Sequence, residues 1–197
     1  TWTRRFDDAR DELRQALAWS ASHDGEAGML AAAPALHHYW YRTGDAPEAG
    51  TWGAHMLTVP GAARASELAA AHSAVAFSAT IRGDPAASRR HAEEAVRLSR
   101  AAGDHRALVD GLFGVAQAAV QVGDVDGASR SSHEALEVCE RTGNHWGRAG
   151  PLATLSVVAF LTGGSLEDAR RLGEEALELH RQLGDIAGQT VMNALPH

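Results

Sequence analysis

The chain contains no lysine, a single cysteine, Cys139, and only 6% aromatic residues among its 197 positions. Without lysine it cannot form a Walker-type phosphate loop or a Schiff base with a carbonyl substrate or pyridoxal. One cysteine permits neither an intrachain disulfide nor a thiolate metal cluster, as is usual for proteins of a reducing compartment. We therefore predict a cytoplasmic protein.

Positive charge is also scarce, because 18 basic residues face 25 acidic ones and the net charge is −7. Nucleic-acid surfaces need a basic stripe, so we predict no direct nucleic-acid binding by this chain. The longest uncharged stretch, 149–166, is interrupted by Gly150, Pro151, Gly163 and Gly164. It is too polar to span a bilayer, so we predict no membrane contact. The first residue is not Met, and we expect the chain to be part of a longer protein.

Alanine is abundant and isoleucine is rare, a mixture that favours helices over strands. Apolar residues such as Leu108, Leu112, Val115 and Ala119 recur at spacings of three and four, as on one face of a helix. No segment shows a convincing strand-length alternation. We predict an all-α fold of about ten helices, over 4–22, 25–43, 46–59, 62–82, 86–102, 105–122, 125–142, 145–162, 166–183 and 186–195.

Glycine recurs at a fixed interval, and the positions that follow it are mostly short polar residues. Five glycines lie 20 residues apart, at Gly83, Gly103, Gly123, Gly143 and Gly163, and Gly184 follows after one extra residue. Glycine readily adopts the left-handed conformation that ends a helix, and a following Asp or Asn can cap the next helix. Each interval is therefore predicted to hold one helix and a tight turn.

Two alanines follow the glycine turns at fixed distances. Gly123-Asp124 precedes Ala128 and Ala135-Leu136, and Gly164 precedes Ala169 and Ala176-Leu177. In this placement of alanines the chain resembles the tetratricopeptide repeat (TPR). Its period is near 40 residues, however, which is longer than the usual TPR period of about 34 and closer to that of HEAT-type repeats, so these remain an alternative. The resemblance implies a right-handed superhelix, or solenoid, of stacked antiparallel helix pairs. We expect one domain over 1–197, with an atypical capping repeat at 1–60, three repeats at 61–185 and a truncated helix at 186–197.

The first sixty residues carry a narrower resemblance. The segments 6–19 and 36–44, followed by Glu48 and Trp52, resemble the start of the repeat region in bacterial signal-transduction ATPases and LuxR-type transcriptional regulators. In those proteins a nucleotide-binding switch precedes the repeats. The resemblance implies a sensor or interaction module of such a regulator, involved in signal transduction and transcription regulation.

Catalytic and metal-binding patterns are not found. No two histidines are three or four residues apart, and His37 and His38, as neighbours on a helix, are expected to point apart. Cys139 is interpreted as a small buried thiol. The acidic pairs, such as Glu93-Glu94 and Glu174-Glu175, are interpreted as solvated surface. We therefore predict no enzyme activity, no metal site and no cofactor.

The first helix of each pair lines the concave face of a TPR superhelix, so its outward residues are the candidate binding site. We expect a protein or peptide partner there, or a small effector, with homo-oligomerisation as a scaffold or filling by a missing helix as alternatives. We also expect Phe77, Phe113 and Phe160 to lie on one continuous concave surface. The candidate groove residues are His38, Tyr41, Arg42, Phe77, Thr80, Ile81, Asp110, Phe113, Gln117, Val120, Gln121, Thr154, Val157, Phe160 and Leu161.

Overall fold

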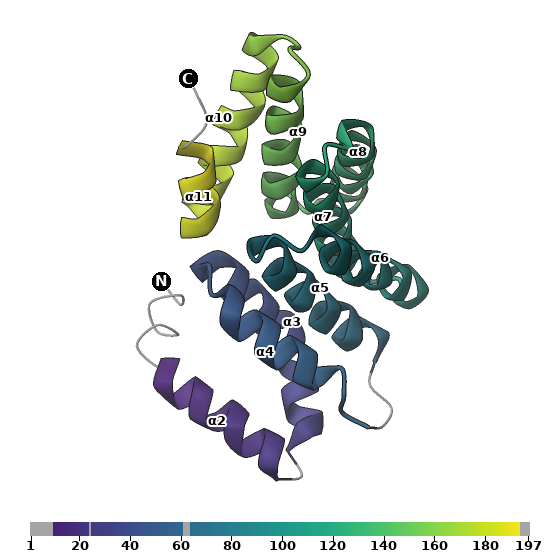
Figure 1. Cartoon of the computed structure of the whole chain (residues 1–197), viewed down its shortest axis with the longest axis vertical. Coiled ribbons are helices and arrows are strands. Elements are labelled where there is room, and N and C mark those ends of the chain that lie inside the picture. Colours follow the sequence, from purple (N-terminus) through teal and green to yellow (C-terminus); the bar gives the residue numbers. More distant parts are fainter. Residues whose placement is uncertain (1–9, 24, 61–63, 194–197) are drawn as a thin grey trace.

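The structure is a computed structural model that describes residues 10–23, 25–60 and 64–193. This part of the chain is all-helical and contains no strand, as predicted. Figure 1 shows the helices packed side by side along an elongated molecule. The α-helices are α2 (Arg10–Ser22), α3 (Glu26–Thr43), α4 (Ala46–Met56), α5 (Ala65–Ile81), α6 (Pro85–Ala102), α7 (His105–Gln121), α8 (Val125–Thr142), α9 (Ala149–Leu161), α10 (Leu166–Leu183) and α11 (Ile186–Asn193).

The recurring glycines end the helices as the sequence predicts. A left-handed backbone lets the amide groups that follow a helix bond back to its last carbonyls, and only glycine adopts it without strain. The next aspartate then caps the following helix: Asp104 accepts a hydrogen bond from the amide of Ala107 at 3.0 Å, and Asp124 from that of Gly127 at 2.9 Å. Positive φ angles occur at Gly44, Gly83, Gly103, Gly123, Gly143, Gly163 and Gly184.

Within the described residues, two predicted boundaries differ from the structure by more than one residue. Helix α4 ends at Met56 instead of residue 59, and Pro60 disfavours helical backbone at Val59, the residue before it. Helix α9 begins at Ala149 instead of residue 145, because a short 3-10 helix, η1 (Trp146–Arg148), precedes it. The predicted residues 4–9, 62–63 and 194–195 lie outside the described part of the chain.

Most helices pack mainly against their neighbours in the sequence, whereas α3 packs more extensively against α5 than against α4. Buried alanines lie where neighbouring helices come close together. A methyl group is the largest side chain that lets two helix axes approach so closely. Ala92 and Ala95 of α6, Ala128 and Ala135 of α8 and Ala176 of α10 are all fully buried. Ala128, Ala135 and Ala176 are among the alanines that follow the glycine turns at fixed distances.

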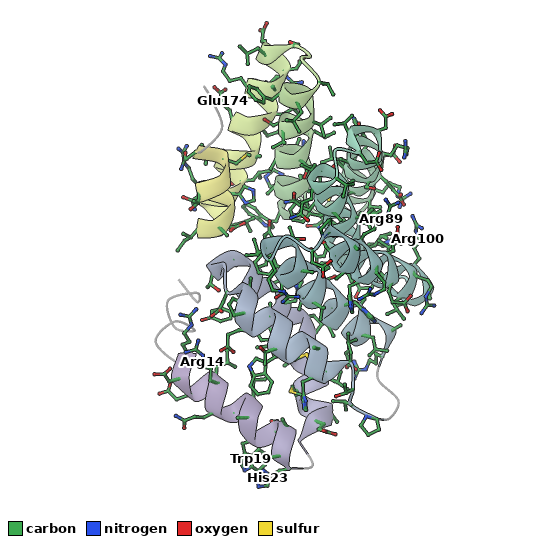
Figure 2. The ribbon with its side chains drawn as sticks, in the orientation of Figure 1. Arg14, Trp19, His23, Arg89, Arg100 and Glu174 are labelled. Carbon is green, nitrogen blue, oxygen red and sulfur yellow. The ribbon has the colours of Figure 1, made fainter. Side chains whose placement is uncertain are left out.

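Charged side chains cover the outer helix faces. Figure 2 shows Arg89, Arg100 and Glu174 at the surface of the molecule. Arg89 pairs with Glu93 at 2.8 Å, and both side chains are more than half exposed. The interpretation of the acidic pair at 93–94 as solvated surface agrees with this position. None of the described helices is long and apolar enough to cross a membrane.

The C-terminal helices return to the N-terminal half. Helix α11 packs against both α10 and α3, and Figure 1 shows its lower end beside the end of α3. Ala187 of α11 approaches the turn at Gly44, where a Cβ atom would lie 3.8 Å from the alanine methyl. This contact places α11 along one side of the space between α3, α5, α7 and α9.

The alanine contacts yield a stability prediction. Replacing Ala135 with Leu will lower the free energy of unfolding by about 1–3 kcal/mol, because three extra carbons must fit between α7 and α8. Urea unfolding followed by circular dichroism measures the change. The control is Ala101→Leu, at an exposed position of α6, and equal stability of Ala135→Leu and the wild type would contradict the packing described here.

Candidate functional site

A cavity of about 150 Å³ lies where α11 closes onto α3, α5, α7 and α9. The described residues that line it come from seven helices, so no single segment of sequence defines it. Eight of the fifteen candidate groove residues line this cavity: His38, Tyr41, Phe77, Thr80, Ile81, Asp110, Phe113 and Gln117.

Three aromatic rings form the apolar wall of the cavity. The ring of Tyr41 meets that of Phe77 edge-on at 5.2 Å and that of Phe113 at 5.7 Å, measured between ring centroids. Helix α9 can approach Phe113 only because Gly150 has no side chain, since a Cβ atom there would lie 2.8 Å from the ring. Edge-on aromatic contacts of this kind add to the stability gained by burial.

Polar groups converge at the α3–α7 side of the cavity. One ligand atom each of His37, His38 and Asp110 lies within 4.8 Å of the others, and His38 Nε2 is 3.4 Å from the Asp110 carboxylate. Burial lowers the pKa of both histidines to about 4, so both rings are neutral at pH 7. Burial also raises the pKa of Asp110.

The two adjacent histidines do not point apart, and this expectation from the sequence is wrong. Their ring centroids are 5.4 Å apart, and both residues line the cavity. Neighbours on a helix are separated by about 100° around its axis, which still lets both face one broad cavity wall. The third member of the group, Asp110, comes from α7 and not from the same helix.

A buried hydrogen-bonded pair fixes α11 over the cavity. His180 Nδ1 of α10 lies 2.7 Å from Asp185 Oδ2, and the other carboxylate oxygen accepts a hydrogen bond from the Gly188 amide at 2.9 Å. Both side chains are almost completely buried. Gly188 is required for this approach, because a Cβ atom there would lie 2.2 Å from His180 Nδ1.

The other seven candidate groove residues do not line the cavity. Arg42 lies near the turn at Gly184, and Gln121 donates a hydrogen bond to the Thr80 carbonyl at 2.7 Å. Thr154 is buried and bonds to the Gly150 carbonyl. Val120 and Val157 are half-buried, whereas Phe160 and Leu161 are exposed.

Phe160 does not share one hollow with Phe77 and Phe113, unlike the continuous surface expected from the sequence. It lines a separate hollow, together with Leu166, Leu177 and Met192. Helix α11 lies between the two, because its Ala187 and Gly188 line the cavity while its Met192 lines the second hollow.

Several cavity residues were not among the candidates. His37 is one of them, and the expectation that it points away from His38 gives no sign that it lines the same cavity. Ser73 and Gly150 carry no pattern that marks them as lining residues. His180 and Gly188 belong to the C-terminal helices, and only the contact of α11 with α3 brings them to the cavity.

A second histidine pair joins α5 and α6 away from this wall. The Nδ1 atoms of His72 and His91 are 2.9 Å apart, so one ring donates a hydrogen bond to the other. Burial, and then the neighbouring His91, lowers the pKa of His72 to about 4, while Glu94 acts in the opposite direction.

This pair predicts an acid-sensitive contribution to stability. A histidine with pKa about 4 in the folded state and 6.5 in the unfolded state binds its proton more readily when unfolded. The contribution of this histidine to the free energy of unfolding is therefore fully present above pH 6.5, and it falls as the pH drops toward 4. His72→Leu will make this decline shallower in urea unfolding at several pH values. The exposed His133→Gln is the control, and an unchanged slope in His72→Leu would contradict the prediction.

Comparison with protein-family models finds no match, and neither does comparison with curated proteins. The arrangement of helices and side chains must therefore support any statement about function.

Proposed function

We propose that this chain is a TPR-type sensor module that binds a small molecule in the cavity beneath α11. The observation that carries the proposal is the combination of three aromatic rings with convergent polar side chains around one partly open cavity. Cavities of this composition, at the junction of several elements, are typical of ligand sites. The module would form part of a bacterial transcriptional regulator with an ATPase switch, as the resemblance of its first sixty residues implies.

The glycine period supports the superhelical part of the proposal. Turns at Gly44, Gly83, Gly123 and Gly163 recur about every 40 residues. Each separates the two helices of one pair, and the second helix carries the buried alanines. A right-handed TPR superhelix would place the first helices α3, α5, α7 and α9 on its concave side, where the cavity lies.

The size and lining of the cavity define the class of ligand. A volume of about 150 Å³ suits a molecule of one ring, comparable to benzene, and is too small for a peptide segment. The Tyr41, Phe77 and Phe113 rings would contact the flat face or edge of such a molecule. His38, Asp110 and Gln117 would bind polar substituents on it. A small effector is thus favoured over a peptide partner.

Thermal melts with ring-sized probes test the proposal, and phenol and imidazole are suitable compounds. We expect at least one of them to raise the melting temperature of the wild-type protein in proportion to its saturation of the site. The matched variant is Ser73→Val. The Ser73 hydroxyl is buried with no hydrogen-bond partner, so valine fills part of the cavity without leaving a polar group unpaired.

Ser73→Val will be as stable as the wild type or more stable, and it will lose the response to the probes. A response that persists in the variant would show that the probe binds elsewhere. No response from the wild type to either compound at millimolar concentration would count against a ring-sized ligand.

A structural scaffold that forms homo-oligomers is the second candidate function. Its support is the exposed apolar group of Phe160, Leu161 and Leu166, which are 47%, 56% and 63% exposed at the turn between α9 and α10. Exposed apolar groups of this kind often mark contacts between proteins. Size-exclusion chromatography with light scattering distinguishes the two: a tight dimer that becomes monomeric in Leu161→Ser favours the scaffold, and a monomer favours the sensor.

A further inference from the structure

We propose that His37, His38 and Asp110 form a binding site for one divalent transition-metal ion of the zinc type. The site lies on the polar wall of the cavity, between α3 and α7 (both labelled in Figure 1). This inference goes beyond the proposed function and does not depend on it, because an ion can bind here whether or not a small molecule does.

The three ligand atoms are close to the spacing that a metal requires. Zinc binds imidazole nitrogen and carboxylate oxygen at about 2.0–2.2 Å, which places ligand atoms about 3.3 Å apart in a tetrahedral site. His38 Nε2 and the Asp110 carboxylate are already at 3.4 Å. The whole group lies within 4.8 Å, so small rotations of the side chains bring all three to one ion.

The burial of His37 supports the site independently of these distances. The side chain is only 7% exposed, and its Nδ1 atom is buried without a hydrogen-bond partner. Buried polar atoms in proteins are almost always paired, so an unpaired nitrogen on a ring that belongs to this group of three side chains indicates a missing partner. A metal ion near His37 and His38 would use neutral imidazoles, the form in which histidine binds metals.

Asp110 also lacks a cation. Among the residues that the structure describes, its only charged-group contact within 4 Å is with His38. Arg106, one turn earlier on α7, is exposed and forms no ion pair with it. A carboxylate in this position is a suitable anionic ligand for a metal ion.

The donor set defines the class of metal. Two imidazole nitrogens and one carboxylate oxygen favour Zn²⁺ and similar transition metals over Mg²⁺ and Ca²⁺, which prefer oxygen ligands. Three protein ligands also leave at least one coordination position open. The open position would face the cavity that His37, His38 and Asp110 line together.

The pair His72 and His91 offers a competing site, and it serves as an internal control. The Nδ1 atoms of the two rings are hydrogen-bonded to each other at 2.9 Å, so an ion could bind both of them only after displacing the proton that they share. Among the described residues, the group of three side chains close enough to hold one ion is His37, His38 and Asp110.

The test is Zn²⁺ binding by the purified, metal-free full chain, measured by isothermal titration calorimetry and by equilibrium dialysis. We expect one Zn²⁺ per chain. Asp110→Asn, which preserves the shape of the side chain, and His38→Gln will each weaken binding about tenfold or more. His91→Gln is the matched control and will bind Zn²⁺ as the wild type does. Circular dichroism verifies that each variant is folded.

Co²⁺ provides a second measurement that does not depend on any variant. Its visible absorption reports nitrogen and oxygen ligands in a site of low coordination number, and Zn²⁺ should displace it. Absence of Zn²⁺ binding by the wild type at micromolar concentration would overturn the proposal. So would binding that is lost in His91→Gln but retained in Asp110→Asn. Probe binding by phenol in the metal-free protein would support the proposed function independently of either result.

Discussion

Replacing Trp40 with Ala will lower the free energy of unfolding by about 3–5 kcal/mol, the largest effect that we predict for a single substitution. Trp40 lies near the C-terminal end of α3 and is only 1% exposed. It belongs to the core formed by α3, α4 and α5, together with Leu36 and Met56. The cost is large because packed helices relax only partially into the space left by an indole ring.

Urea unfolding monitored by circular dichroism measures this loss. The matched control is Trp146→Ala in η1, because Trp146 is 48% exposed. We expect a change of about 0.5 kcal/mol or less there, as is usual for surface positions. Similar losses in the two variants would show that α3 is not packed as described.

Replacing Asp185 with Ala will lower the free energy of unfolding by about 3 kcal/mol, because two contributions disappear together. The carboxylate caps α11 through the Gly188 amide, and it also holds the ring of the buried His180. Its loss leaves His180 Nδ1 without a partner in a buried position. Helix α11 will then open locally, and its amides will exchange with deuterium faster than those of α7.

Asp84→Ala separates the two contributions to the Asp185 effect. Asp84 caps α6 in the same way, through the Ala87 amide at 2.9 Å, but it is exposed and has no histidine partner. We expect a loss of about 1 kcal/mol from this variant, the usual value for an N-cap. Equal losses in Asp84→Ala and Asp185→Ala would contradict a structural role for the His180–Asp185 pair.

Most of the local structure could be predicted from the sequence, because the signals are themselves local. A glycine that must adopt a left-handed backbone and an aspartate that caps the next helix act within a few residues of each other. Gly103-Asp104 and Gly123-Asp124 therefore mark both ends of α7. Part of the misplaced end of α4 is equally local, because Pro60 disfavours helical backbone at Val59.

The cavity could be predicted only in part, because it depends on contacts between distant segments. The repeat pattern identifies the helix faces that carry Tyr41, Phe77 and Phe113. No periodicity indicates that α11 turns back onto α3, and this contact separates Phe160 from the other two phenylalanines. The same limit applies to the metal-ligand group, since Asp110 lies 72 positions after His38 in the sequence.

The most direct test of ligand binding in the cavity is ¹⁹F NMR of protein labelled with fluorotyrosine. The chain has two tyrosines. Tyr41 lines the cavity, whereas Tyr39 is 2% exposed and belongs to the core. Tyr41→Phe assigns the two signals. During titration with phenol or imidazole, we predict a saturable shift of the Tyr41 signal while the Tyr39 signal stays in place. A Tyr41 signal that does not move, or two signals that move together without saturation, would contradict a ligand site in the cavity.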